Sequence, residues 1–484
     1  MEDDNARPLH IMFLPLMAHG HTIPAIDIAK LFASRGLQVS IITTQENAQS
    51  FVKALERTKN STLPITIVPI QFPSKDVGLP EGCDSLDAVM AMGNEKDLLY
   101  KFIMGTSILH EPVEQIIRER KPSCLVADMF FPWATEAAAK YGIPRLVFHG
   151  TSVFTLCVVE CMRVHQLQLA GSSDHERFVI PNLPGAVKFS KSQLIGMDTT
   201  DPSSEFYQFF NVCKESWVKC SGVIFNSFNE LEPQYAAFYR DILKGKTWHV
   251  GPVSLCNRAW DEKAQRGKQS SISENDCMAW LASKERSSVV YVCFGSTTLF
   301  SYAQLKELAA GIEAAGQNFI WVVGHAKKSD TSKEDVDWLP RGFTERTKDR
   351  GLVIRGWAPQ VLILDHEAVG AFVTHCGWNS VLEGIAAGVA MVTWPIFADQ
   401  FCNEKLVREV LKIGVPVAEE QSGEVVKAEE IERAVRRIMV GEEARHMSER
   451  AKKLAEMAHR AVEVGGSSYS DFESLVNTLR FKQI

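Results

Sequence analysis

The sequence predicts an α/β protein built from two doubly wound, Rossmann-like domains that face a cleft. Three observations support this fold class. The chain has 484 residues, more than one hydrophobic core usually holds, which favours two or three domains. Short apolar runs alternate with stretches of helical periodicity, as in a parallel sheet covered by helices. The same alternation begins again in the second half of the chain, so two similar units lie in series.

The first half supplies four expected strands. Apolar runs at residues 9–15, 37–44, 124–130 and 145–150 (LHIMFLP, LQVSIITT, CLVADMF and RLVFHG) are each short enough for a buried strand. A helix is expected between the first two runs, where apolar residues recur at helical spacing over residues 22–34. A second helix is expected between the last two runs. Strand, helix and strand in this order predict a parallel sheet.

The second half repeats the pattern. A strand is expected at SVVYVCFGS, followed by a helix near residues 304–315. Four further strands are expected at NFIWVVG, GLVIRGW, GAFVTHCG and AMVTWPI. Residues 251–275, between the two halves, are polar and lack sustained periodicity, which indicates a linker. A long helical pattern runs from about Glu449 to the end of the chain.

The composition disfavours several classes of function. Hydrophobic residues make up 45% and charged residues 23% of the chain, as in a globular protein. A net charge of −7 gives no basic footprint for nucleic acid. No apolar run approaches the roughly 20 residues of a membrane span, and no signal-peptide pattern precedes the first strand. The eleven cysteines lack CxxC or zinc spacing, so we expect reduced, mostly buried thiols and a cytoplasmic location.

Two histidines follow the first strand, at the edge where doubly wound domains bind ligands. No GxGxxG follows this strand and no P-loop signature occurs, which disfavours a dehydrogenase or a P-loop enzyme. His19 and His21 instead open the first expected helix. The positive end of the helix dipole disfavours a protonated imidazole, and a neutral imidazole can act as a general base. The alternative is a capping or packed histidine.

Asp128 ends the strand CLVAD. Strand ends of one parallel sheet lie side by side, so this carboxylate could reach an imidazole on the neighbouring loop. There it would fix the tautomer of the ring and stabilise its protonated form. The alternative is that Asp128 caps the helix that follows.

The most specific feature is the stretch from Trp357 to Gln400. Trp357 offers a flat indole for stacking on a base. The segment THCGWNS is expected at a strand-to-helix turn, where Gly377 permits close backbone approach and His375 and amide N–H groups suit an anionic phosphate. Asp399 and Gln400 offer a carboxylate and an amide for the hydroxyls of a sugar. The alternative is that these are ordinary polar loop residues, but all of these groups would then have to occur together in one stretch by coincidence.

This stretch resembles the signature box of the plant secondary-product UDP-glycosyltransferases at nearly every characteristic position. The resemblance covers almost the whole chain and includes AHGHTIP, GLPEGC, ADMFFPWATEAA, RLVFHGTS, SGVIFNSFNELEP, WHVGPVSL and VCFGS. The segments ADMFFPWATEAA and HGTS look like the branch that glycosylates flavonoids and related phenolics, with relatives that act on triterpenoids and steroids.

The resemblance implies a GT-B fold and an inverting mechanism without metal or cofactor, in which UDP-glucose is a co-substrate. It implies an acceptor-binding domain over residues 1–250, a linker over 251–275 and a nucleotide-sugar domain over 276–460. The C-terminal helix, over residues 461–484, is expected to pack back on the N-terminal domain. A monomer is expected.

The resemblance also assigns roles to individual residues. His21 is the general base, and Asp128 orients it. Trp357 stacks on uracil, backbone groups of Ala358 bind the edge of the base, and Glu383 holds the ribose hydroxyls. The remaining residues are expected near the phosphates (Ser296, His375, Gly377, Asn379 and Ser380), near the sugar (Gln360, Trp378, Asp399 and Gln400), and around the acceptor (Phe130, Phe148 and Phe154, with Phe397 from the other side).

Two positions depart from the family pattern. Many relatives have glutamine where this chain has His19, which leaves a second candidate base two residues before His21. Relatives often have arginine where this chain has Gly324, so any contact made by that arginine is in doubt here.

The sequence therefore predicts a UDP-glucose-dependent O-glucosyltransferase that acts on a hydroxyl of a small lipophilic plant metabolite, a flavonoid or another phenolic. Glutamine at position 400 goes with glucose by resemblance. A triterpenoid or steroid is the alternative acceptor. From other classes, the alternatives are a non-catalytic UDP-sugar binder of the same fold, and a UDP-sugar epimerase or a phosphorylase on a related fold.

Overall fold

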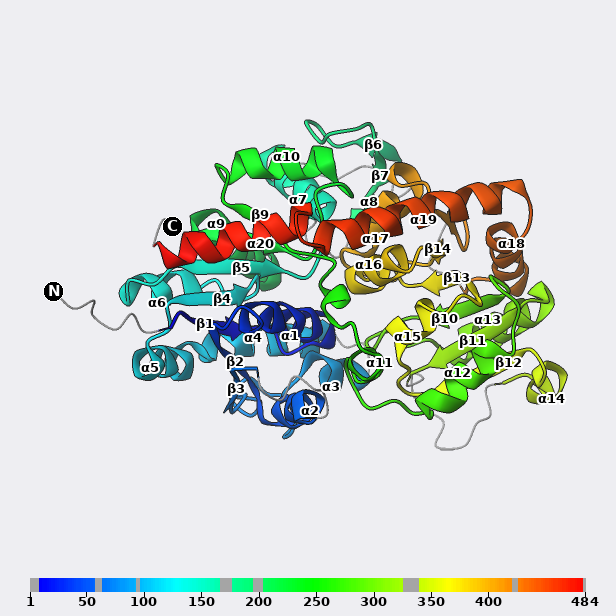
Figure 1. Cartoon of the computed structure of the whole chain (residues 1–484), viewed down its shortest axis with the longest axis horizontal. Helices are drawn as coiled ribbons and strands as arrows, with labels where there is room; N and C mark the ends of the chain where they lie inside the picture. The colour runs from blue at the N-terminus through cyan, green and yellow to red at the C-terminus, as the bar shows by residue number, and fades with distance from the viewer. Residues whose placement is uncertain are drawn as a thin grey trace.

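The computed structural model describes residues 8–56, 63–92, 96–165, 176–194, 203–324, 339–419 and 425–481. These residues form two α/β units, each built around a parallel sheet, one after the other along the chain (Figure 1). The arrangement confirms the two α/β units that the repeated pattern of strands and helices predicts.

The first unit contains a seven-stranded parallel sheet in the order β3-β2-β1-β4-β5-β8-β9. The interior strand β1 pairs with β2 on one side and with β4 on the other, so the strand order reverses at β1. Ligands of open α/β sheets bind at such a reversal, outside the carboxyl ends of the strands. The strands are β1 (His10–Leu14), β2 (Gln38–Thr44), β3 (Ile65–Ile70), β4 (Cys124–Asp128), β5 (Arg145–His149), β8 (Gly222–Phe225) and β9 (Thr247–His249).

The second unit contains a six-stranded parallel sheet in the order β12-β11-β10-β13-β14-β15. Here β10 pairs with β11 and β13, so the order reverses at β10. The five strands expected in this half are all present. The strands are β10 (Val289–Cys293), β11 (Asn318–Val323), β12 (Gly351–Arg355), β13 (Val369–Thr374), β14 (Ala390–Thr393) and β15 (Gly414–Pro416).

The helices of the first unit lie between its strands in the chain, with an additional antiparallel pair of short strands, β6 (Arg177–Val179) and β7 (Lys188–Ser190). The helix expected over residues 22–34 is α1, which begins three residues earlier and contains His19 and His21. The helices are α1 (His19–Ala33), α2 (Gln45–Glu56), α3 (Leu86–Ala91), α4 (Lys96–Ile108), α5 (His110–Arg120), α6 (Ala134–Lys140), α7 (Val153–His165), α8 (Lys191–Leu194), α9 (Glu205–Lys219) and α10 (Pro233–Ile242).

Residues 251–275, the expected linker, contain the short 3₁₀-helix η1 (Val253–Cys256) and the helix α11 (Trp260–Ala264). The helices that follow belong to the second unit and the C-terminal segment. They are α12 (Glu274–Ala282), α13 (Tyr302–Ala315), α14 (Phe343–Thr347), α15 (Gln360–Leu364), α16 (Trp378–Ala386), α17 (Gln400–Lys405) with the π-helical turn η2 (Leu406–Val410), α18 (Ala428–Met439), α19 (Glu442–Val462) and α20 (Ser467–Arg480).

The C-terminal segment is two helices rather than the single one that the sequence predicts. α19 begins seven residues before Glu449, and the chain turns before α20 at Gly465, whose φ of +86° favours glycine. The two helices run one after the other across the length of the molecule, α19 beside the second unit and α20 beside the first (Figure 1). Phe472 of α20 packs on Phe32 of α1 in the first unit, with ring centroids 4.9 Å apart. The exact limits of the domains and of the linker stay a prediction.

Candidate active site

The imidazole of His21 and the carboxylate of Asp128 form a hydrogen-bonded pair at the carboxyl edge of the first sheet. Nδ1 of His21 lies 2.7 Å from Oδ2 of Asp128. The pair forms because β1 and β4 are parallel neighbours: Asp128 is the last residue of β4, and His21 lies in the first turn of the helix that follows β1. The side chain of Asp128 is fully buried, whereas that of His21 keeps 19% of its surface exposed. The contact leaves the imidazole accessible from one side.

Asp128 does not cap the helix that follows it. Helix α6 begins at Ala134, six residues on, and its N-cap residue Trp133 makes no side-chain cap hydrogen bond. The second oxygen of Asp128, Oδ1, accepts a weak 3.3 Å hydrogen bond from the backbone of Phe130. Of the two interpretations of Asp128, the structure favours the one in which Asp128 is the partner of an imidazole.

The pKa of His21 lies above its ordinary value of 6.5. Burial lowers this pKa, but the charge of Asp128, the hydrogen bond to it and the charge of Asp399 together raise it by more. The helix dipole by itself predicts the opposite, a pKa of His21 below its ordinary value. That expectation is wrong because a carboxylate in direct contact outweighs the partial charge of a helix end.

His19 has a different partner. Its Nδ1 lies 2.5 Å from Oδ2 of Asp87, and its backbone N–H donates to the same oxygen at 2.9 Å. Burial raises the pKa of Asp87, but hydrogen bonding and attraction from His19 outweigh it and lower the pKa to about 2. The ring of His19 is 5.8 Å from that of Trp357, while the ring of His21 is 6.0 Å from that of Phe130. The two histidines therefore face different halves of the site.

His375 lies at the end of β13, packed between two glycines. A Cβ on Gly295 would lie 2.8 Å from its ring, and one on Gly377 would lie 2.5 Å away, so both positions require the absence of a side chain. Burial lowers the pKa of His375 to about 4, and its Nδ1 has no hydrogen-bond partner among the described residues. A neutral imidazole near pH 7 can offer an N–H to an anion but not a charge.

Helix α16 begins beside His375 and contacts the first unit. Its second residue, Asn379, donates from Nδ2 to the backbone oxygen of Gly20 at 2.7 Å. One turn further along the helix, Glu383 accepts a 2.7 Å hydrogen bond on Oε2 from Nε2 of Gln360, which also reaches Oγ of Ser380 at 3.2 Å. The start of α16 is therefore adjacent to the residue that precedes His21.

Asp399 and Gln400 lie where α17 begins and are tied into the structure. Oδ2 of Asp399 accepts from Thr151 of the first unit at 2.7 Å and from Asn403 at 2.9 Å. Burial raises the pKa of Asp399. Oε1 of Gln400 accepts from the backbone N–H groups of Ile396 and Phe397 at 2.8 and 3.1 Å. Gln400 therefore has only its amide N–H groups left for a ligand, rather than both a donor and an acceptor.

Comparison with known proteins identifies the family. Residues 209–459 match the family model described as UDP-glucoronosyl and UDP-glucosyl transferase. The chain is 51% identical to the scopoletin glucosyltransferase of Nicotiana tabacum, over 97% of this chain and 98% of that one. It is 50% identical to UDP-glucose flavonoid 3-O-glucosyltransferase 7 of Fragaria ananassa, over 99% and 98% of the two chains.

The chain belongs to the plant secondary-product UDP-glycosyltransferases. Its structure is similar to the crystal structure of Glycyrrhiza uralensis UGT73P12 complexed with glycyrrhetinic acid 3-O-monoglucuronide, with a TM-score of 0.88 and 39% identity over 98% of this chain and 96% of that one. The fold is therefore GT-B, as the resemblance implies.

In this UDP-glycosyltransferase, three aromatic side chains that the sequence assigns to the site are buried. Phe148 and Phe154 are 2% and 0% exposed and belong to the hydrophobic cores, so their side chains cannot line an acceptor pocket. The indole of Trp378 is also buried, and its Nε1 donates to the backbone oxygen of Asn226 at 2.8 Å, so it is not free to contact a sugar. Phe130, half-buried beside His21, and Phe397, 37% exposed, keep the expected accessibility.

The structure also adds residues to this transferase site that the sequence analysis missed. Thr151 and Asn403 hold Asp399, and Arg266 forms an ion pair with Glu383. Thr151 could have been found from the sequence, because it lies within the HGTS segment that resembles the family. Asn403 lies beyond the signature stretch and Arg266 lies in the aperiodic linker, so no sequence pattern points to either residue. Ser296 is exposed after β10 and interacts with Asp87.

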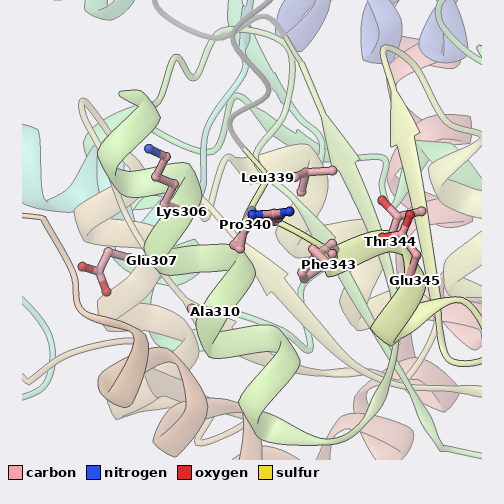
Figure 2. Close-up of a pocket in the computed structure, with 10 residues that line it drawn as sticks. Lys306, Glu307, Ala310, Leu339, Pro340, Phe343, Thr344 and Glu345 are labelled. Atoms are coloured by element: carbon pink, nitrogen blue, oxygen red, sulfur yellow. The ribbon is translucent and has the colours of Figure 1, made fainter.

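Other features of the transferase lie outside this site. A hollow of about 800 Å³ lies beside α13 and α14. Its lining residues include Lys306, Leu339 and Phe343 (Figure 2). None of its lining residues is among those predicted for donor or acceptor. Within the described ranges, no three His, Cys, Asp or Glu side chains are grouped as a metal site requires. No helix of the described part is long and apolar enough to cross a membrane.

Proposed function

We propose that this UDP-glycosyltransferase transfers glucose from UDP-glucose to a hydroxyl of a small phenolic acceptor, with His21 as the general base and Asp128 as its partner. The observation that carries the proposal is the contact between Asn379 and Gly20. It brings the start of α16, which offers N–H groups to a diphosphate, next to the imidazole that would deprotonate the acceptor. The proposed base, in the first unit, therefore lies next to the proposed diphosphate-binding end of α16, in the second unit.

The proposed reaction is a direct displacement. The hydrogen bond to Asp128 keeps the proton of the neutral ring on Nδ1, which leaves Nε2 to accept the proton of the acceptor hydroxyl. The acceptor oxygen then forms a bond to the anomeric carbon while the bond to UDP breaks on the opposite face, so an α-linked donor gives a β-glucoside. Negative charge that develops on UDP is met by N–H groups of His375 and of α16.

The choice of acceptor rests on the relatives and on Phe130. Two relatives of about 50% identity are named for scopoletin and for a flavonoid, which supports a phenolic acceptor. The ring of Phe130 beside His21 suits a flat aromatic molecule. The solved relative bound to glycyrrhetinic acid 3-O-monoglucuronide supports a triterpenoid as the second candidate. The monomeric state and the cytoplasmic location stay predictions.

The donor should be glucose rather than galactose or glucuronate. Asp399 presents a carboxylate and Gln400 presents N–H groups, whereas the stretch from Trp357 to Gln400 contains no arginine for a glucuronate carboxylate. We expect wild-type enzyme to prefer UDP-glucose by at least about tenfold, since one unpaired buried polar group costs ~1–3 kcal/mol. Initial rates with each donor at equal concentration test this. Faster turnover of UDP-galactose, UDP-xylose or UDP-glucuronate would show that the assignment of the sugar pocket is wrong.

The reaction should be metal-independent. Protein N–H groups and the start of α16 are proposed to stabilise the leaving diphosphate in place of a divalent ion. We expect activity to stay within about twofold in saturating EDTA, measured as release of UDP. Complete loss of activity that magnesium or manganese restores would refute this part of the mechanism.

The pH dependence should reflect the raised pKa of His21. The base is active when deprotonated, so kcat/KM falls as the pH drops through this pKa. Because the pKa lies above 6.5, the acidic limb should lie at a higher pH than an unperturbed histidine would give. An aliphatic alcohol is the right acceptor for the measurement, since it does not ionise in this range. An acidic limb at or below pH 6 would contradict the pairing with Asp128.

A further inference from the structure

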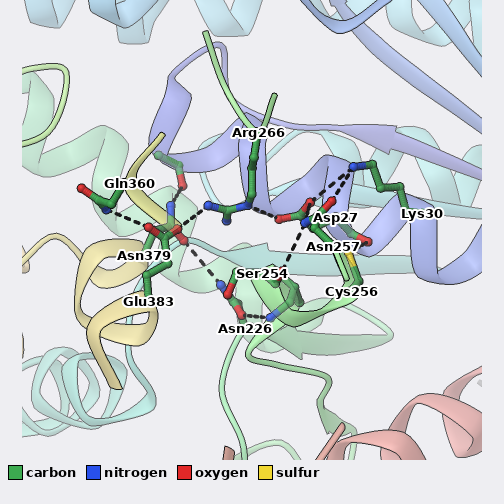
Figure 3. A network of polar contacts seen from close by, with 12 residues as sticks. Asp27, Lys30, Asn226, Ser254, Cys256, Asn257, Arg266, Gln360, Asn379 and Glu383 are labelled. Atoms are coloured by element: carbon green, nitrogen blue, oxygen red, sulfur yellow. Dashed lines mark hydrogen bonds and ion pairs between the residues drawn. The ribbon is translucent and has the colours of Figure 1, made fainter. Parts of the chain in front are cut away.

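Arg266, in the segment between α11 and α12, joins the two units through a buried guanidinium group. Its side chain is 8% exposed. Nε lies 2.7 Å from Oδ2 of Asp27 on α1, and Nη1 forms an ion pair with Oε1 of Glu383 on α16 (Figure 3). Both carboxylates are almost fully buried, so the single guanidinium is shared between one acidic residue of each unit.

The position of Arg266 is fixed from the side of the first unit. Oδ1 of Asp27 accepts a 2.8 Å hydrogen bond from Nδ2 of Asn257, and Oδ1 of Asn257 accepts a 2.7 Å hydrogen bond from Lys30. Asp27 is therefore held on both oxygens by linker residues, by Asn257 on one and by Arg266 on the other. Its orientation, and with it that of the guanidinium group, does not depend on Glu383.

Among the described residues, each oxygen of Glu383 has one hydrogen-bond donor, which leaves one acceptor site open on each. Arg266 occupies one site on Oε1, and Gln360 occupies one on Oε2. A carboxylate has about four acceptor sites, two on each oxygen. The two open sites match a pair of neighbouring hydroxyl groups, each of which donates one hydrogen bond.

The same linker segment also supports the indole of Trp357. A Cβ on Gly267 would lie 2.3 Å from Cζ2 of Trp357, so the linker backbone lies directly against the ring. The backbone N–H of Trp357 donates to Oγ of Ser271 at 2.9 Å, and the backbone N–H of Ser271 donates to the oxygen of Trp357 at 2.8 Å. The linker therefore contacts both side chains that are expected to bind the nucleoside.

We propose that Arg266 is a positioning residue for the ribose of the nucleotide donor. It holds the Glu383 carboxylate so that each oxygen keeps one acceptor site for the 2′- and 3′-hydroxyls. The inference rests on the proposed function and on the assignment of Glu383 to the ribose that the family resemblance implies. Lysine would not replace Arg266 fully, because the two carboxylates are bound by different arms of one planar group. The donor site thus includes the interdomain linker as well as the C-terminal signature stretch.

The test compares the binding of UDP and of 2′-deoxy-UDP by isothermal titration. The ratio of the two Kd values reports recognition of the diol and is insensitive to a general loss of nucleotide affinity. We expect wild-type enzyme to bind 2′-deoxy-UDP about tenfold more weakly. In Arg266→Gln, UDP binding should weaken and the ratio should fall to within about twofold of unity. Arg346→Gln is the matched control, because Arg346 pairs with Glu313 on the surface of the second unit, and it should keep the wild-type ratio.

Two further variants make the result decisive. Arg266→Lys keeps the buried charge if Arg266→Gln does not fold, and its ratio should also fall. Glu383→Gln tests the assignment of Glu383 itself. If Glu383→Gln lowers the ratio and neither Arg266 variant does, the inference is overturned while the proposed function stands. Tighter binding of UDP by Arg266→Gln would also overturn it, because Arg266 would then obstruct the site. A wild-type ratio near unity, or no effect of Glu383→Gln, would instead refute the assignment of Glu383 to the ribose.

Discussion

Replacing His21 with Ala should lower kcat for an aliphatic alcohol acceptor by about 10²–10⁴-fold, the usual contribution of a general base. The imidazole is the group that is both paired with a buried carboxylate and accessible beside Phe130, and no alcohol ionises on its own near pH 7. The loss should be smaller for acidic phenols, because part of such an acceptor is already ionised. Steady-state kinetics with one alcohol and one acidic phenol measure both effects.

The control for this experiment is His19→Ala. His19 is bound to Asp87 and its ring lies near Trp357, so its removal should have a far smaller effect on kcat than the removal of His21. Equal turnover of the alcohol by His21→Ala and by wild type would refute the assignment. A large loss in His19→Ala with little loss in His21→Ala would make His19 the base.

Replacing Asp128 with Asn should lower turnover by a similar factor, up to about 10⁴-fold, while the Kd for UDP stays near the wild-type value. The amide preserves the size of the side chain but no longer fixes the proton on Nδ1 of His21. It also removes the charge that raises the pKa of His21, so the acidic limb of the pH profile should move to lower pH. Both effects are measured with the same alcohol acceptor.

The matched control is Asp87→Asn, which removes the carboxylate paired with His19. It should move the acidic limb much less than Asp128→Asn does, because the charge of Asp87 contributes less to the raised pKa of His21 than Asp128 does. If Asp128→Asn unfolded the protein and produced no specific kinetic defect at temperatures where it is folded, Asp128 would be a structural residue. An unchanged acidic limb in Asp128→Asn would show that the carboxylate of Asp128 does not raise the pKa of the base.

The sequence predicts most of the buried strands but misses β8, a buried strand of only four residues, and the marginal strands. Central strands such as β10 and β13 are continuous apolar runs, because both faces of a parallel sheet are covered. β3 lies at the edge of its sheet and alternates between exposed and buried residues, and β9 has only three residues, so neither produces such a run. The break between α19 and α20 depends on Gly465, and the helical spacing of apolar residues does not indicate a break there.

The site is predictable where topology alone brings residues together. His21 and Asp128 meet because the ends of two neighbouring parallel strands must meet. Side-chain packing and electrostatics are harder to predict from the sequence. An apolar residue such as Phe154 suits a core as well as a pocket, and only the fold distinguishes the two. The direction of the shift in the pKa of His21 depends on a 2.7 Å contact, and Arg266 lies in a linker whose sequence has no pattern.

The most direct test of the central claim is the product that purified wild-type enzyme forms from UDP-glucose and a phenolic acceptor such as scopoletin or a flavonol. Mass spectrometry, with NMR of the anomeric proton, identifies the product, and UDP release is followed with and without the acceptor. We expect an acceptor mass increased by one hexose, a β-linked glucoside, and release of UDP that requires the acceptor. Binding of UDP-glucose without any glycoside across phenolic and triterpenoid acceptors, epimerised UDP-sugar, or an α-linked product would contradict the proposed function.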